Sequence, residues 1–311
     1  PVICAGRMDN PDMALESLEK GECDIVSLGR PLLADPDYVN KLRAGRMAQV
    51  RPCISCQEGC MGRVQEYSMI NCAVNPQAAR ERDMAYEPIL KSKKVMVVGG
   101  GVAGCEAARV LAIRGHQPEL YEKGSQLGGN LLPGGAPEFK EDDLALAKWY
   151  ETTLKDLRVP VYYNHEVTKD EVLAGDYDAV IIATGSQPKK FSLGDDEKVY
   201  TASQVLLKEK DCGETTVIVG GGLVGCETAL WLAEHGKKVT IVEALDKILA
   251  VNGPLCHANK DMLERLVPYH GVEVVAGARV KKYENGVLTA DTAEGEKTIP
   301  CDSVILAVGY R

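Results

Sequence analysis

The sequence lacks the features of a membrane or nucleic-acid-binding protein. No stretch approaches the roughly 18 consecutive apolar residues of a membrane-spanning helix, and no charged segment followed by an apolar run opens the chain as a signal peptide would. Positive charge is also in short supply, because 36 Lys and Arg face 45 Asp and Glu, for a net charge of −9. A basic binding face is therefore not expected. We expect a cytoplasmic protein with neither nucleic acid nor a membrane as partner.

Histidine is scarce as well, with five residues and no pair at the spacing of metal ligands, whereas cysteine is plentiful, with 11 residues. In a chain of 311 residues, so many cysteines indicate reduced thiols and metal ligands rather than a disulfide framework. This length predicts two or three domains. Apolar runs stand at both ends, next to Pro1 and Arg311, so we expect the chain to be a piece of a larger protein.

The clearest pattern is an internal repeat. Residues 95–123 and 216–244 align without gaps and share every glycine. Each copy reads as an apolar strand, a glycine turn, an amphipathic helix that ends at Gly115 or Gly236, and a second strand that ends in glutamate. This order is that of a βαβ unit. We therefore expect an α/β protein with two Rossmann-like domains in tandem.

Both copies carry G-x-G-x-x-G in the strand–turn–helix context that a dinucleotide site requires. The first glycine permits a tight turn, the second lets the backbone approach a pyrophosphate, and the third lets the helix pack closely on the strand. The glutamate at the end of the second strand is placed to bind ribose hydroxyls. The predicted residues are Gly99, Gly101, Gly104 and Glu122 in the first copy, and Gly220, Gly222, Gly225 and Glu243 in the second.

The surroundings of the two sites differ. The first copy is followed by a glycine-rich stretch, 124–139, that suits a longer ligand such as FAD. Ala244 and Leu245 follow Glu243, so no arginine is placed to hold a 2′-phosphate, and NADH is expected rather than NADPH. Strands that end in glycine turns, over 177–185 and 301–309, are typical of chains that pass between two nucleotide domains. We assign to the first site also Gly128, Gly129, Thr184 and Gly185.

A group of cysteines precedes both repeats. Three thiols lie within the segment RPCISCQEGC, and a fourth follows in NCAVNP. A redox dithiol would use only one C-x-x-C pair, and structural zinc usually has two separated pairs. Three close ligands with one distant fourth suit a [4Fe-4S] cluster, which also has a redox use beside two dinucleotide sites. The pattern favours this cluster, with zinc or unliganded thiols as alternatives, on Cys53, Cys56, Cys60 and Cys72.

The first fifty residues read as two consecutive βα units. PVICAGR and DIVSLGR are predicted strands, and each precedes a predicted helix. Two such units fit the end of a (β/α)₈ barrel, whose last strand ends commonly hold a phosphate through backbone N–H groups and basic side chains. A generic α/β fragment is the alternative. The residues predicted to bind the phosphate are Gly6, Arg7, Gly29 and Arg30.

In this order the motifs resemble the C-terminal part of a family of iron–sulfur flavoenzymes. This family includes 2,4-dienoyl-CoA reductase, enoate reductases and trimethylamine dehydrogenase, and its members are old yellow enzyme-like NADH:flavin oxidoreductases. The resemblance covers essentially the whole chain. It rests on AGR…SLGRPLLADP, on RPCISCQEGC…NCAVNP and on the two VGGG turns.

The resemblance implies a route for electrons from NAD(P)H to FAD, to the [4Fe-4S] cluster and to FMN. It implies that the enzyme reduces an activated C=C bond of an unsaturated carbonyl compound, of the 2,4-dienoyl-CoA or 2-enoate type. The motif residues above then match the family's FMN-phosphate, cluster, FAD and NAD(P)H sites. The barrel strands that carry the family's catalytic residues have no counterpart here, so catalytic residues stay unknown and the chain is expected to be inactive alone.

The predicted domains follow from these motifs. They are a barrel end over 1–48, a cysteine segment and linker over 49–92, an FAD domain without its last segment over 93–210, and an NAD(P)H domain over 211–311. Three other functions are weighed: an amine dehydrogenase like trimethylamine dehydrogenase, an FAD/NADPH thiol–disulfide reductase, and a zinc-stabilised nucleotide-binding regulator. The expected partner is a small unsaturated carbonyl substrate, and a homo-oligomer stays open.

Overall fold

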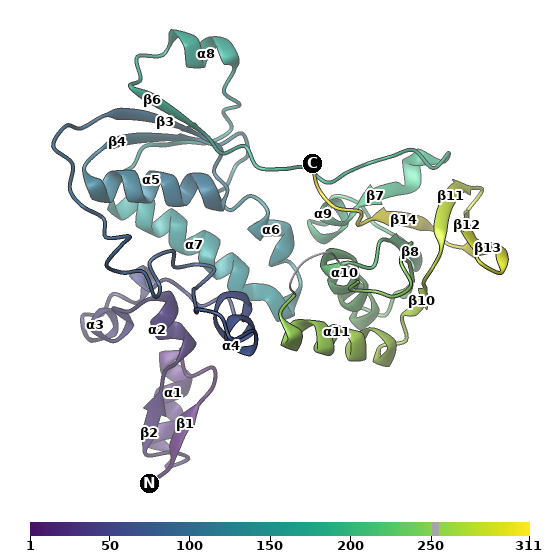
Figure 1. Cartoon of the computed structure of the whole chain (residues 1–311), viewed down its shortest axis with the longest axis horizontal. Coiled ribbons are helices and arrows are strands. Elements are labelled where there is room, and N and C mark those ends of the chain that lie inside the picture. The colour runs from purple at the N-terminus through teal and green to yellow at the C-terminus, as the bar shows by residue number, and fades with distance from the viewer. Residues whose placement is uncertain (251–254) are drawn as a thin grey trace. The chain divides into compact units, whose positions relative to one another are not determined.

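The computed structural model describes residues 1–250 and 255–311 (Figure 1). The chain groups into two compact units, each built from two stretches of sequence. Unit 1 consists of Pro1–Gly128 and Asp142–Ala183, and unit 2 consists of Gly129–Glu141 and Thr184–Arg311. Both units contain a parallel sheet with helices, which confirms the predicted α/β class. The four domain limits stay predictions.

Unit 1 begins with the two predicted βα units. Strand β1 (Ile3–Ala5) pairs in parallel with β2 (Ile25–Ser27), and α1 (Pro11–Glu19) connects them. Asn10 caps this helix by accepting the backbone N–H groups of Asp12 and Met13, and a proline occupies its first position. The shorter helices that follow are α2 (Arg30–Ala34), α3 (Tyr38–Arg43) and α4 (Arg63–Gln65). Helix α2 was not predicted.

The larger sheet of unit 1 has the strand order β5-β4-β3-β6 and is parallel throughout. Helix α5 (Val102–Arg114) follows β3 and packs against the sheet, as Figure 1 shows. Leu120 and Val97 are fully buried beneath it. The remaining elements are β3 (Lys94–Val98), β4 (Gln117–Tyr121), β5 (Val161–Tyr162), β6 (Ala179–Ile182), α7 (Glu141–Asp156) and α8 (Lys169–Ala174).

Unit 2 contains a five-stranded parallel sheet in the order β10-β9-β8-β14-β7. Ile218, Ile241 and Ile305 are fully buried in one of its cores. Its strands are β7 (Val199–Thr201), β8 (Thr215–Val219), β9 (Lys238–Val242), β10 (Glu273–Val275) and β14 (Ser303–Leu306). Its helices are α6 (Leu131–Gly134), α9 (Ala202–Leu206), α10 (Leu223–Glu234) and α11 (His257–Tyr269).

The early segment Gly129–Glu141 is tied to unit 2 by specific contacts. Helix α6 packs against α9, and the indole N–H of Trp231 donates to Glu138 at 3.0 Å. Lys140 forms an ion pair with Glu227 at 3.0 Å. Unit 2 therefore includes a short segment, 129–141, that is separated in sequence from the rest of the unit.

An antiparallel sheet completes unit 2, with β12 between β11 and β13. Tyr283 is fully buried and its hydroxyl contacts the backbone carbonyls of Cys301 and Asp302, at 3.1 and 3.0 Å. These carbonyls lie directly before β14, so the tyrosine fixes the antiparallel sheet to the parallel one. The strands are β11 (Arg279–Glu284), β12 (Val287–Thr292) and β13 (Gly295–Pro300).

Among the described residues, no helix combines the length and the apolar character needed to cross a membrane.

Replacing Tyr283 by Phe should lower the free energy of unfolding by about 1–3 kcal/mol, because the buried carbonyl of Cys301 and the neighbouring carbonyl of Asp302 lose the one hydroxyl hydrogen that they share. Urea denaturation of the purified chain measures this change. The matched control is Tyr269→Phe, because Tyr269 is exposed and its replacement should change the stability by less than about 0.5 kcal/mol. Equal effects of the two substitutions would contradict the role of the Tyr283 hydroxyl.

Candidate functional site

The first glycine loop has the geometry that its sequence predicts. Gly99 adopts φ +109° between β3 and α5, a conformation that disfavours any side chain. A Cβ atom on Gly104 would overlap the carbonyl oxygen of Gly99, so the helix start lies directly on the turn. Gly101 is the N-cap of α5, and no side chain caps that end. The uncapped N–H groups and the positive end of the helix dipole can therefore receive a phosphate.

The second loop repeats this arrangement. Gly220 has φ +104°, and a Cβ atom on Gly225 would overlap the carbonyl oxygen of Gly220. Gly222 is the N-cap of α10, again without a side-chain cap. The two loops therefore fit a pyrophosphate in the same way.

The two predicted ribose carboxylates also occupy equivalent positions. Glu122 accepts the backbone N–H groups of Gly100 and Gly124, at 2.7 and 2.6 Å. Glu243 accepts those of Gly221 and Leu245, at 2.5 and 2.7 Å. Each carboxylate is thereby held beside its glycine loop by two charge-assisted hydrogen bonds. This places both at the mouth of the site where a ribose would lie.

The second loop opens into a cavity of about 700 Å³. Ligand sites commonly have volumes of roughly 300–1,000 Å³. Gly220, Gly222 and Glu243 line the cavity, and so does Arg279, the first residue of β11. The sequence has no arginine directly after Glu243, but the fold brings Arg279 into the same cavity. Ala278 donates its backbone N–H to the Glu243 carbonyl, which brings the next residue to the cavity.

The remaining predicted FAD residues fall in both units. Gly128 donates its backbone N–H to the carbonyl of Gly100 at 2.9 Å, so it lies beside the first loop. Gly129, Thr184 and Gly185 belong to unit 2. Within unit 1 the structure thus brings Gly128 together with the glycine loop and Glu122.

The cysteine segment is folded tightly around a close backbone contact. Ser55 and Gln57 adopt left-handed φ values of 53° and 60°, and a π-helical turn follows over Glu58–Gly62. A Cβ atom on Gly59 would overlap the side chain of Asn71 and lie 2.8 Å from its carbonyl oxygen. Only glycine leaves room for this approach, which brings the residue before Cys72 against the turn that carries Cys60.

The four thiols lie within electrostatic range of one another. Burial raises the pKa of Cys56, an N–H hydrogen bond from Glu58 lowers it, and Cys53, Cys60 and Cys72 each raise it. No three His, Cys, Asp or Glu side chains in the described ranges are grouped closely enough to hold one metal ion. In this structure the four thiols are therefore not gathered into a closed metal site, and their assignment as ligands stays a prediction.

A small cavity of about 220 Å³ lies at the two Gly-Arg strand ends. Cys53 lines this cavity together with Gly6, Arg7, Gly29 and Arg30. Burial raises the pKa of Cys53, while a Ser55 N–H hydrogen bond and the charge of Arg30 lower it.

One partner at this cavity was not predicted from the sequence. Arg7 forms an ion pair with Asp142 at 2.6 Å and donates to the Ser55 hydroxyl at 2.9 Å. Asp142 belongs to α7, far along the chain from Arg7, so no local sequence pattern predicts that the two residues pair.

The cysteines of the two glycine-loop helices are packed inside the fold. Cys105 and Cys226 are fully buried, and each thiol donates to a loop carbonyl, of Gly100 and Gly221 respectively. Burial raises the pKa of each thiol to about 12. Neither can serve as a reactive thiolate near neutral pH.

Two βαβ units with the same glycine loop and the same carboxylate define a tandem dinucleotide-binding fold. The chain belongs to the pyridine nucleotide-disulphide oxidoreductase family, whose model matches residues 93–311. The model of the NADH:flavin oxidoreductase / NADH oxidase family matches residues 1–49. Both families are flavin- and nicotinamide-dependent oxidoreductases, and the family resemblance drawn from the motifs is confirmed.

Individual relatives agree with this family. The chain is 48% identical to cinnamate reductase of Clostridium sporogenes over 310 residues, covering 100% of the chain and 47% of that protein. It is 38% identical to NADH oxidase of Thermoanaerobacter brockii, covering 99% and 48%. A structure of 2-naphthoyl-CoA reductase with 2-naphthoyl-CoA superposes with a TM-score of 0.93 at 30% identity, covering 100% and 47%. The chain thus spans about half the length of these relatives.

Cys105 and Cys226 should resist iodoacetamide in the folded chain at about pH 8. With a pKa of about 12, only about one thiol in ten thousand is ionised there, and labelling should increase only as the pH nears that value. Mass spectrometry of the labelled chain measures this. The same chain in denaturant is the control and should label at both positions. Equal labelling in the folded and unfolded chain would contradict the burial.

Proposed function

We propose that the chain is the electron-input part of an NADH-dependent reductase of activated C=C bonds. Residues 211–311 bind NADH, 93–210 bind FAD, 49–92 hold a [4Fe-4S] cluster, and 1–48 form the end of a barrel that holds the phosphate of FMN. When bound, these groups supply two-electron transfer from the nicotinamide and one-electron transfer beyond it. The chain's own residues bind and orient them.

The observation that carries this proposal is the small cavity at the Gly-Arg strand ends. Its wall contains Cys53 as well as Gly6, Arg7, Gly29 and Arg30. A cluster ligand and a phosphate site would therefore lie side by side, which would keep a cluster and a flavin close to one another. The exposed apolar side chains of Val2 and Ile3, with 57% and 63% exposure, suit strands of a larger barrel.

The cysteine segment offers backbone hydrogen bonds to two of the proposed ligands. Cys53 and Cys56 accept backbone N–H groups from Ser55 and Glu58. Hydrogen bonds of this kind stabilise thiolate ligands and tune cluster potentials. The segment also precedes both nucleotide loops, whereas the cysteines of 93–311 are all buried. This distribution disfavours a thiol–disulfide reductase.

The substrate class rests on the relatives and stays part of the proposal. Cinnamate contains a C=C bond conjugated to a carboxylate, and 2-naphthoyl-CoA contains an unsaturated ring conjugated to a thioester carbonyl. The 48% identity to cinnamate reductase extends over the whole chain. We infer a reductase of α,β-unsaturated carbonyl compounds rather than an amine dehydrogenase.

The first test is anaerobic analysis of the purified chain for iron, acid-labile sulfide and flavin, together with its absorbance spectrum. About four irons and four sulfides per chain, with a broad band that bleaches on reduction, would support the proposal. Zinc without sulfide would overturn the cluster and favour a zinc-stabilised nucleotide-binding protein.

Replacing Gly59 by Ala should remove most of the iron and sulfide. The new methyl group would displace Asn71 and separate Cys72 from the turn that carries Cys60. Iron and sulfide contents, with circular dichroism of both proteins, measure the effect. The matched control is Gly45→Asn at an exposed left-handed turn with no atom within 4 Å of a Cβ, because asparagine tolerates this conformation. Full iron content in Gly59→Ala would contradict the assignment.

NADH should bind at least about tenfold more tightly than NADPH, because the Glu243 carboxylate accepts ribose hydroxyls and repels a 2′-phosphate. In Glu243→Ala, NADH should bind about 10- to 100-fold more weakly. The affinity for NADPH should fall less than that for NADH, because Arg279 remains in the cavity. Calorimetric titration of both nucleotides measures these constants.

The matched control is Glu294→Ala, which removes an exposed carboxylate outside the cavity and should leave both constants unchanged. Equal affinity of the wild type for NADH and NADPH would contradict the assigned preference. Absence of any nucleotide binding would favour the amine-dehydrogenase alternative.

A further inference from the structure

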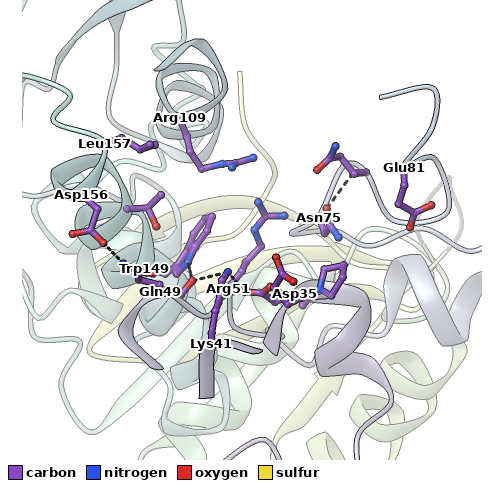
Figure 2. A pocket seen from close by; sticks show the side chains of 15 residues that line it. Asp35, Lys41, Gln49, Arg51, Asn75, Glu81, Arg109, Trp149, Asp156 and Leu157 are labelled. Carbon is purple, nitrogen blue, oxygen red and sulfur yellow. Dashed lines mark hydrogen bonds and ion pairs between the residues drawn. The ribbon is translucent and has the colours of Figure 1, made fainter. Parts of the chain in front are cut away.

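A second polar cavity, of about 470 Å³, lies within unit 1 away from the sites above (Figure 2). Its wall comes from the segment after α2, from the residues that lead into the cysteine segment, and from α5 and α7. None of the predicted dinucleotide, phosphate or cysteine residues lines it. The residues that carry the argument are Asp35, Lys41, Gln49, Arg51, Arg109 and Trp149.

Arg51 is the exceptional residue of this cavity. Its side chain is buried, with 8% of the residue exposed, and its Nε has no hydrogen-bond partner among the described residues. The guanidinium carbon lies 4.7 Å from the ring centroid of Trp149. This cation–π contact holds the group in place but accepts none of its N–H bonds. A buried N–H of a charged group without an acceptor is costly, so an acceptor for the Arg51 Nε would stabilise the fold.

The two other cations that line the cavity are already paired. Lys41 forms an ion pair with Asp35 at 2.6 Å, and Arg109 forms one with Glu106 at 2.7 Å. Asp156 accepts the side-chain N–H of Gln49 at 2.9 Å. Among the described residues, the guanidinium of Arg51 has no ion-pair partner of its own, although carboxylates stand on the rim of the cavity.

The rim of the cavity limits the charge of any ligand. Three exposed carboxylates lie there, on Asp37, Glu81 and Asp156, and they would repel a dianion. The guanidinium of Arg51 carries a single positive charge, which matches a ligand with a single negative charge. Its flat edge, formed by Nε and one terminal nitrogen, suits the two oxygens of a carboxylate.

We propose that this cavity is a binding site for a small monocarboxylate, which pairs side-on with Arg51. The guanidinium extends toward the middle of the cavity in Figure 2, between Trp149 and Asn75. The cavity is large enough for substituents beyond the carboxylate. The site is independent of the nucleotide and cluster assignments, because it uses none of their residues.

A ligand bound at this site would stabilise residues 49–51, which lead into the cysteine segment. Gln49 accepts the indole N–H of Trp149 through its backbone carbonyl at 3.0 Å, and Arg51 stacks on the same ring. A carboxylate on Arg51 would therefore fasten residues 49–51 to α7. Since Cys53 follows two residues later, the ligand would also order the start of the cysteine segment.

Acetate is the probe, and the fluorescence of Trp149 reports its binding. The chain has two tryptophans, so the titration uses Trp231→Phe, in which Trp149 alone emits. Acetate should change the emission saturably at constant ionic strength, against sodium chloride as reference. Inorganic phosphate near pH 8, mainly a dianion, should bind more weakly. Arg51→Met should weaken acetate binding about tenfold or more.

Arg82→Met is the matched control, because Arg82 is exposed and lies outside the cavity; it should leave acetate binding unchanged. If Arg51→Met does not fold, Arg51→Lys keeps the charge but loses the planar edge, and it should bind acetate several-fold more weakly. Absence of saturable acetate binding to the parent protein would overturn the proposal. So would equal affinity in the Arg51→Lys or Arg51→Met protein, or phosphate binding more tightly than acetate.

Discussion

The geometry of both nucleotide-binding units depends on the close contact between the start of a helix and the glycine turn before it. The third glycine of each loop, Gly104 or Gly225, lies so near the carbonyl of the first that a single methyl group would not fit. This contact fixes the direction of α5 and α10 against their sheets, and it sets the free N–H groups of each helix start at the edge where parallel strands end. The position of the acidic residue after the next strand follows from the same geometry, because that strand pairs directly with the first.

The two copies of the repeat share the hydrogen bonds of their glycine loops but differ in the segments around them. In both copies the carboxylate bonds to the middle glycine of the loop, and a buried cysteine bonds to the carbonyl of that glycine. Outside this framework, the first copy continues into a glycine-rich stretch and the second opens into a cavity with Arg279. Duplicated structure thus explains the common binding chemistry, and the added segments account for the different ligands proposed.

Local patterns predicted the elements of the site but not the partners that cross the chain. The glycine loops, their helices and the two βα units at the start follow from periodicity and turn residues, which act over a few positions. Asp142, Asn71 and Arg279 reach their sites through strand order and backbone contacts that only the folded chain defines. Arg51 lies inside the cysteine motif itself. Its ring contact with Trp149 comes from a helix far along the sequence, and its unpartnered Nε is visible only in the folded chain.

The division of the chain into two interleaved units has a consequence for its synthesis. Unit 1 is interrupted by 129–141, and unit 2 takes that short stretch before the rest of its sequence exists. During translation the first unit can close only after Ala183 has emerged, and α6 must wait for α9 and α10. Unit 1 can therefore complete its fold before unit 2, but only with residues 129–141 looped out and waiting for the rest of unit 2. A single recombination point cannot exchange one unit without also exchanging part of the other.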